Sequence, residues 1–585
     1  MKRSALLDVD VLRLLFVVYA IAASSLVIAG PVTTEPWRQL ARTDLDFVHR
    51  TIAEAHPGAI DPANPSFRVW MEAGYRQALT LLPQVTDFST ALAAVRWYVR
   101  GFRDGHLIVS DDTRPHGELI ASKGWGISYI GGQYVVTSTA TRWPAPLPPL
   151  GATLASCDGR SPEAIAAEDV APYVDRRDLP MSKRRVAHAI GEPVIAMGHR
   201  LDSCTFDPQR GEAPVTLVVV YRLLPFDQWA KVTYGGIPSR DHTDDYQLRD
   251  GLLWIRAGNF NPTAERYVAL KRMADELRHL EGVRAIVFDV RGNGGGNSAI
   301  GDLLFDAATG GLRYDRRGLD RLPEIYAEWR VSDVSIETAK SWLATTLVTY
   351  GHGSSEVEWA RDHLRSLLVA QAKGTLWARQ DSSSRRLTRN DMIRRHARLR
   401  HFAGPIAVLT DEYCASACLD FVDQIRLVPG ALQLGATTSA DSVYIDTGRV
   451  RLPSGNHLVL PLKVWRNRLR GNNQPWVPDV AFDGNLGDDE AVRKWVVSIL
   501  DKRWSSQMPS AKPPHARTAS RPWLGCAPAV PRRRRARIGS GSSRRSNRPT
   551  HPRVAYSTAS RWRHGLPSNR ISAIVLSYSM NTSSS

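Results

Sequence analysis

The sequence predicts an α/β fold in which a mostly parallel sheet is covered by helices. The strand pattern "GLLWIRAGNF" at 251–260 is followed by the amphipathic helix pattern "PTAERYVALKRMADELRHLEG" and by the continuous apolar strand "VRAIVFDV" at 283–290. A strand, helix and strand in this order imply a right-handed crossover between parallel strands. A second buried strand, "PIAVLT" at 405–410, also precedes a helix pattern. We therefore assign the α/β core to residues 226–502.

Two other regions precede this core. Residues 31–106 read as a helical N-terminal region, because "TDLDFVHRTIAEAHPG" and "TDFSTALAAVRWYVRGFRDGH" open on Thr-Asp capping signals and repeat apolar residues every three or four positions. In residues 107–225, short segments rich in β-branched residues are either continuously apolar or alternate between apolar and polar residues, and Gly and Pro turns separate them. This pattern predicts a smaller β-rich domain. Within the core, the polar, Arg-rich residues 313–402 have helical spacing, and we expect them to form a helical insertion that roofs the site as a lid.

The two ends of the chain differ from the rest in composition. Residues 1–30 carry Lys2, Arg3 and Arg13 ahead of an apolar stretch of 16 residues, 14–29, which predicts a signal peptide or a signal anchor. We therefore expect a periplasmic or secreted protein, with membrane association through this segment as the alternative to cleavage. Residues 503–585 hold 16 Lys and Arg and no Asp or Glu, so that most of the net charge of +18 belongs to this tail. Its composition predicts disorder, and a solvated tail is the simpler reading than binding to nucleic acid or anionic lipid.

The five cysteines do not form a metal-binding pattern. They lack CxxC spacing and paired histidines, so the sequence supports no zinc site. Export would permit disulfides, and the plausible pairings are Cys157 with Cys204 and Cys414 with Cys418. We expect neither a metal nor an organic cofactor.

Ser416 is the first candidate for chemistry. It lies in "TDEYCASACLDFVDQI", after a buried strand and a short turn, at the expected first turn of an apolar helix. A helix N-terminus supplies unpaired N–H groups and positive potential, which suit a nucleophile and a developing oxyanion. On local sequence alone, Ser416 fits a helix cap equally well.

A glycine-rich loop adds a second element. The strand at 283–290 runs directly into "RGNGGGNSAIGDLLFD", where Gly294, Gly295 and Gly296 allow the backbone to approach a ligand before a helix begins. The loop lacks both GxGxxG and GxxxxGK[ST], so dinucleotide and nucleotide phosphate sites are not favoured. Its amides remain available to an oxyanion.

These segments together resemble a known family. "VFDVRGNGGGNS", "AVLTDEYCASACLDF", "LGATT" and "PWVPDVAF", together with "CDGRSPEAI" earlier in the chain, resemble the tail-specific or C-terminal processing serine peptidases. The resemblance implies a crotonase-like (ClpP/crotonase) peptidase core and polypeptide substrates. In the serine–lysine branch of the family a lysine follows the serine, but here Ala440 and Asp441 occupy the matching positions.

The histidine-using branch, which resembles the tricorn protease core, fits better. "RGFRDGHLIVS" places His106 at the matching helix-to-strand junction, and histidine can serve as the general base that a serine nucleophile needs. Alone, His106 would be read as a structural histidine. In the family, an acid orients the histidine, and the matching position in this chain is Asn472. Asp441 and Asp479 are alternatives, although a structural role at a turn explains Asp479 better. The resemblance implies oxyanion donors at Gly295, within one residue, and Ala417.

The sequence therefore predicts an exported serine peptidase that forms an acyl-enzyme on Ser416 with His106 as general base. One alternative is a non-catalytic ligand- or peptide-binding protein on the same fold, which the missing acid would favour. Another is a crotonase-like acyl-CoA enzyme, which would explain neither the serine turn nor the export signal. No specific nucleic acid partner is expected.

Overall fold

The computed structural model describes residues 34–111, 117–208, 211–236, 244–310, 325–380, 402–468 and 470–507. The signal segment expected at 1–30 lies outside these ranges, and so does the basic tail expected at 503–585, apart from residues 503–507, which end a helix. None of the helices in the described ranges combines the length and apolar character needed to span a membrane. The described residues up to Arg503 belong to one compact unit.

The predicted α/β core is built on a six-stranded sheet with the strand order β18-β15-β14-β11-β10-β9. Neighbouring strands are parallel except at the edge, where β9 runs antiparallel to β10. The strands are β9 (Asp244–Arg249), β10 (Leu252–Ala257), β11 (Ala285–Asp289), β14 (Ile406–Thr410), β15 (Leu432–Gly435) and β18 (Val480–Ala481). All five residues of β11 and of β14 are buried, as their continuous apolar sequences predict.

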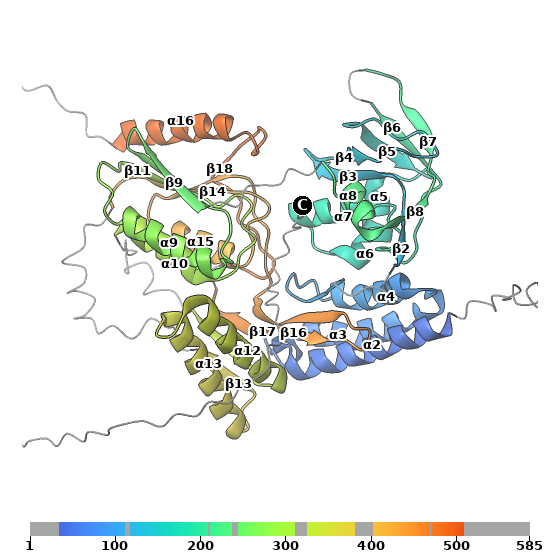
Figure 1. Cartoon of the computed structure of the whole chain (residues 1–585), viewed down its shortest axis with the longest axis horizontal. Helices are drawn as coiled ribbons and strands as arrows, with labels where there is room; N and C mark the ends of the chain where they lie inside the picture. The colour runs from blue at the N-terminus through green and yellow to red at the C-terminus, as the bar shows by residue number, and fades with distance from the viewer. Residues whose placement is uncertain are drawn as a thin grey trace, which may run out of the picture. The chain divides into compact units, whose positions relative to one another are not determined.

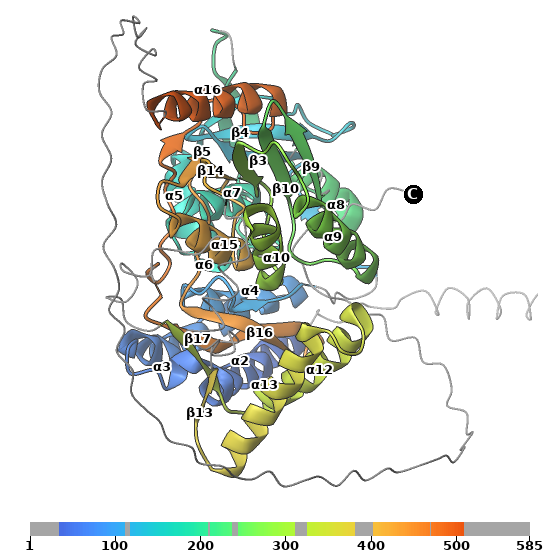
Figure 2. The same ribbon diagram turned by 90° about the vertical axis from the view of Figure 1, so that its left-hand side faces the viewer.

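Helices cover both faces of this sheet. On one face lie α9 (Ala264–Leu277), α10 (Ser298–Thr309) and α15 (Ala417–Arg426), which share an apolar cluster with Leu253 and Ile255 of β10 (Figures 1 and 2). Trp254 points to the opposite face, because successive strand residues alternate. There the guanidinium of Arg493, from α16 (Asp489–Gln507), lies 4.9 Å from the Trp254 ring centroid. The carboxyl ends of β11 and β14 carry the glycine-rich loop and the Ser416 turn.

A second sheet joins distant parts of the chain. It contains β1 (Ile108–Val109), β12 (Tyr326–Arg330), β13 (Trp377–Gln380), β16 (Tyr444–Arg451) and β17 (His457–Arg466), and β17 pairs with β1, β12 and β16. The N-terminal helices α2 (Glu35–Ala55), α3 (Pro65–Leu79) and α4 (Phe88–Arg100) pack their apolar faces into one cluster with this sheet. The helices between residues 35 and 100 thus share their apolar core with the second sheet.

The segment 313–402 differs from the purely helical insertion that the sequence predicts. Its described part contains α12 (Asp333–Tyr350) and α13 (Ser355–Ala372), but also β12 and β13. The two helices lie beside β16 and β17 (Figure 2), and they bury Ile336, Ala339 and Leu367 in the cluster of the N-terminal helices. Residues 326–330 form a strand and not a helix, because Ala327 and Trp329 are buried and alternate with the more exposed residues of β12. The described part of this segment therefore belongs to the hydrophobic core of the N-terminal helices and is not only a lid over the site.

The predicted β-rich domain holds a five-stranded antiparallel sheet. Its strands are β3 (Trp125–Ile130), β4 (Gln133–Thr139), β5 (Thr153–Cys157), β6 (Ser203–Asp207) and β7 (Val215–Val218), while β2 (Leu119–Ser122) pairs separately with β8 (Arg222–Pro225). Between β5 and β6 the chain forms short helices, including α7 (Pro180–Ala189). The Cys157–Cys204 disulfide joins directly opposed residues of β5 and β6.

Candidate active site

Ser416 occupies a strained turn between β14 and α15. It stands at the N-cap position of α15 with φ 55° and ψ −126°, and its side chain makes no capping hydrogen bond. A positive φ is costly for a residue with a side chain and persists only where the surroundings impose it. Such strained strand-to-helix turns expose a serine hydroxyl above the end of a sheet. Ser416 thus does not use its side chain to cap the helix, as the helix-cap alternative would require.

The surroundings impose this conformation from three sides. The Ser416 amide donates a hydrogen bond to Asp441 Oδ2 at 2.8 Å. The Cys414–Cys418 disulfide, one of the two predicted pairings, closes a covalent ring around the turn. From the third side the glycine-rich loop approaches so closely that a Cβ atom at Gly295 would lie 2.6 Å from the Ser416 Cβ.

The glycine-rich loop presents its amides unequally. Gly295 has φ 102°, and its amide donates to the side chain of Asn293 at 2.8 Å. Gly294 is exposed and faces open space, and no described residue accepts a hydrogen bond from its amide. Across the narrow gap, the Ala417 amide has no acceptor among the described residues either, and it would lie 2.9 Å from a Cβ atom at Gly295. The predicted donor Gly295, by contrast, already has an acceptor.

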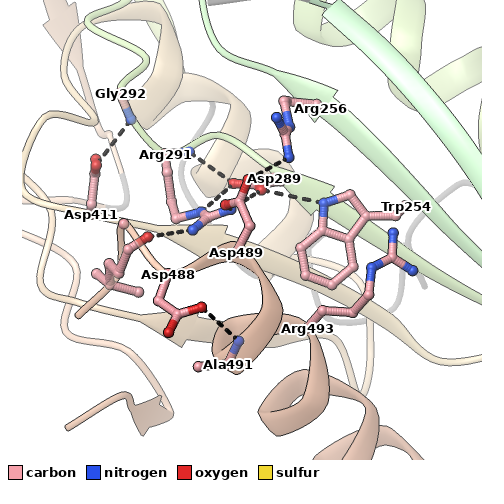
Figure 3. A network of polar contacts seen from close by, with 12 residues as sticks. Trp254, Arg256, Asp289, Arg291, Gly292, Asp411, Asp488, Asp489, Ala491 and Arg493 are labelled. Carbon is pink, nitrogen blue, oxygen red and sulfur yellow. Dashed lines mark hydrogen bonds and ion pairs between the residues drawn. The ribbon is translucent and has the colours of Figure 1, made fainter. Parts of the chain in front are cut away.

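A carboxylate network fixes the base of this loop (Figure 3). At the end of β11, Asp289 forms a bidentate ion pair with Arg291, with N–O distances of 2.8 and 2.6 Å. At the end of β14, Asp411 accepts hydrogen bonds from the amides of Gly292, at 2.9 Å, and of Tyr413, at 3.0 Å. One carboxylate therefore ties the glycine-rich loop to the Ser416 turn.

His106 follows a buried acidic turn. The Asp104 Oδ1 atom accepts the His106 amide at 2.9 Å, while Oδ2 lies 3.4 Å from Nε2 of His56. His56 is fully buried, and burial lowers its pKa; its Nδ1 accepts the amide of Gly58, so the proton is on Nε2 and faces Asp104. Burial acts to raise the pKa of Asp104, but its contacts with His56 and His106 lower it overall. The imidazole of His106 is half-buried, and its Nδ1 has no hydrogen-bond partner.

Two side chains connect the His106 turn with the Ser416 turn. A Cβ atom at Gly105 would lie 2.5 Å from a guanidinium nitrogen of Arg177, and this nitrogen donates to the Ala440 carbonyl at 2.8 Å. From the other side, Asn473 donates through its side chain to the Arg103 carbonyl at 2.8 Å and through its amide to the Asp441 carbonyl, also at 2.8 Å. The residues that border His106 and those that border Ser416 are thus held together, although no hydrogen bond joins the His106 ring to the Ser416 hydroxyl.

The residues considered for orienting the general base lie apart from one another. Asn472 turns its side-chain oxygen to the amide of Val443, at 3.0 Å. Asp479 accepts the amide of Gln433 at 2.7 Å and so joins β15 to β18. Sequence reasoning missed Asn473, whose Oδ1 is buried without a partner, and Arg177, for which no motif gave a signal. It also left Asp441 undecided, because a contact to the backbone of Ser416 has no sequence signature.

No metal site is evident in the described ranges, where His, Cys, Asp and Glu residues nowhere gather in groups of three or more that could hold an ion.

Known families and solved structures include proteins that are similar to this chain. Residues 253–481 match the family model described as peptidase family S41. No curated protein matches the chain in sequence. Among solved structures, mature CPAF is similar with a TM-score of 0.51 and 13% identity, over 80% of this chain and 98% of that one. Mature CPAF complexed with lactacystin is similar with a TM-score of 0.51 and 14% identity, over 80% and 99%. The tricorn protease gives a TM-score of 0.32 and 14% identity, over 80% and 37%.

The two CPAF structures agree with the α/β fold, and the family match supplies the class of activity. Residues 253–481 are similar to peptidase family S41, and the chain is a serine-type peptidase.

Proposed function

We propose that Ser416 is the nucleophile of this peptidase and that it forms an acyl-enzyme with the substrate. The observation that carries the proposal is the strained Ser416 conformation, at φ 55° with a side chain that makes no capping hydrogen bond to the helix. A conformation of this cost is kept where strain serves a site, and a serine that only capped the helix would use its hydroxyl to do so. The family's peptidase chemistry favours this reading over a binding protein or an acyl-CoA enzyme.

His106 is the general base in this proposal. It would take the proton of Ser416 as the hydroxyl attacks the scissile carbonyl, and then give it to the leaving amine. Water would next attack the acyl-enzyme with the same base. Hydrogen bonds of this kind are often long in the free enzyme and tighten in the substrate complex. The connections through Arg177 and Asn473 support a His106 ring directed to the Ser416 turn.

The amides of Ala417 and Gly294 would stabilise the oxyanion. Neither amide has an acceptor among the described residues. Gly294 precedes Gly295, which lies against the Ser416 turn, and Ala417 opens the helix α15, whose N-terminus carries positive potential. The Gly295 amide is less suited because it donates to Asn293. Gly295 would instead allow the two loops to approach.

Asn473, the neighbour of the aligned Asn472, is the better candidate to orient His106. Its side-chain nitrogen holds the Arg103 carbonyl, three residues before His106, and its Oδ1 is a buried acceptor without a donor. The Nδ1 atom of His106 is a buried atom without a partner as well. An Nδ1–H bond to Asn473 Oδ1 would satisfy both atoms and leave Nε2 free for Ser416. Asn473→Ala tests whether Asn473 orients His106, and Asn472→Ala is its matched control.

The substrates are polypeptides, as the peptidase family implies. We further propose a crotonase-like arrangement of the α/β core, and export of the protein, which the basic and apolar residues 1–30 and the two disulfides support. No step of the proposed reaction requires a metal or an organic cofactor.

A fluorophosphonate probe tests the nucleophile. The purified protein should be labelled, with the adduct on the peptide that contains Ser416, and Ser416→Ala should abolish labelling and peptide hydrolysis. Ser439→Ala changes a nearby buried serine and is the matched control. Equal labelling of Ser416→Ala would refute the assignment, and a folded wild-type protein that is never labelled would favour a binding protein.

A further inference from the structure

We propose that the Cys414–Cys418 disulfide positions the nucleophile, so that full peptidase activity requires this bond to be intact. The proposal rests on the proposed role of Ser416. The bond encloses Ala415, Ser416 and Ala417 in one covalent ring. The ring therefore contains both the proposed attacking hydroxyl and one proposed oxyanion amide.

The disulfide is anchored in the buried core. Both cysteines are fully buried, and both belong to the apolar cluster between the sheet and α15. Cys418 lies in the first turn of α15, where its amide donates to the Ala415 carbonyl at 3.1 Å. The Cys414 carbonyl accepts the amide of Ser439 at 3.1 Å, two residues before Asp441. Each end of the ring is thus fixed to a buried element.

The strained turn needs such a restraint. Without it, Ser416 could relax to a negative φ and continue α15 by one residue, since helical φ is favoured at this position for any residue with a side chain. That change would redirect the hydroxyl and the Ala417 amide together. The hydrogen bond from Ser416 to Asp441 and the close approach of Gly295 oppose it from two sides, whereas a link between residues 414 and 418 limits the rotation of every bond between them.

The second disulfide provides an internal control. Cys157 and Cys204 are equally buried, but they join β5 and β6 of the β-rich domain, and none of the proposed catalytic residues lies on these strands. Removing it should affect stability without changing the Ser416 turn.

The test compares Cys414→Ala/Cys418→Ala with Cys157→Ala/Cys204→Ala at a temperature well below both thermal midpoints. We expect the first variant to lose at least about tenfold in kcat and in the rate of fluorophosphonate labelling, with KM nearly unchanged. The second should have a lower midpoint but label at the wild-type rate. Labelling of the first variant within about twofold of wild type would overturn the proposal, as would an equal loss in both variants.

A measurement on the wild-type chain covers the case in which the first variant does not fold. Excess dithiothreitol opens a disulfide when its thiolate attacks one sulfur, the S–S bond breaks, and the second reagent thiol closes a ring. The two cysteines gain two electrons and two protons, and the reagent is oxidised. Peptide mapping after alkylation shows which pair has opened.

Labelling should fall in step with opening of Cys414–Cys418 and return on reoxidation, while opening of Cys157–Cys204 alone should not change it. Full labelling of chains with an open Cys414–Cys418 pair would overturn the proposal. Failure of the proposed function is distinguishable, because then the untreated protein is not labelled at Ser416 at all.

Discussion

Replacing Gly295 by alanine tests whether close approach of the two loops shapes the site. The new Cβ would lie 2.6 Å from the Ser416 Cβ, 2.7 Å from the Ala415 carbonyl oxygen and 2.9 Å from the Ala417 nitrogen. Two of these three atoms are backbone atoms, which cannot rotate away. Overpacking of this kind costs about 1–3 kcal/mol, and a side chain at φ 102° adds about 1–3 kcal/mol. The expected loss of unfolding free energy is therefore about 2–6 kcal/mol.

Activity should fall further than stability alone explains. If the loops separate to relieve the contact, Ser416 and its neighbouring amide move with them, and a displacement of about 1 Å can cost about 10² in rate. Chemical denaturation and fluorophosphonate labelling measure the two effects. Gly294→Ala is the matched control, because a Cβ there meets no atom within 4 Å and the backbone nitrogen is kept. A Gly295→Ala protein with wild-type stability and labelling would refute the reasoning.

Three further predictions concern the base, the nucleophile turn and pH. His106→Ala should lower peptidase kcat/KM by about 10³ or more with a nearly unchanged thermal midpoint, and a joint collapse of both would show a structural histidine. Asp441→Ala should slow labelling of Ser416 by about tenfold and Asp441→Asn by less, since the amide oxygen can still accept the Ser416 amide; equal rates in both variants would contradict this. Burial among tryptophans lowers the pKa of His363 to about 4. Because the unfolded chain binds this proton below about pH 6.5, stability should fall by up to about 3 kcal/mol from pH 6.5 to pH 4, and His363→Phe should remove that part of the dependence in denaturation measured against pH.

Much of the α/β core could be predicted because its signals are local. The strands before the glycine-rich loop and before Ser416 are continuous apolar runs, and the structure buries every residue of both. The segment 313–402 was harder because β12 and β13 are short and gain their stability from partners far away in the sequence. A helical period says nothing about which distant strand will pair with the residues between two helices.

In the candidate site, too, residues with local sequence signals could be predicted and residues that depend on distant contacts could not. Ser416 and the glycine-rich loop follow from strand ends, whereas Arg177 and Asn473 act through backbone carbonyls more than 200 residues away. Contacts of a side chain to a distant carbonyl leave no motif. The choice between Asn472 and Asn473 likewise depended on a one-residue difference in side-chain direction, since Asn473 has φ 54° and Asn472 has no positive φ.

The strand β17 has a consequence for the order in which the chain folds. Leu460 and Val464 of β17 belong to the same apolar cluster as residues of α2 and α4, yet more than 350 residues separate the end of α4 from the start of β17. At a synthesis rate of about 5–20 residues per second, the first helices wait roughly 20–70 s for these partners. During that time their apolar faces have no native cover from β17, and long-range pairing of this kind is slow in itself. Biogenesis of this protein therefore depends on keeping its earliest helices from aggregating until nearly the whole folded part of the chain has been made.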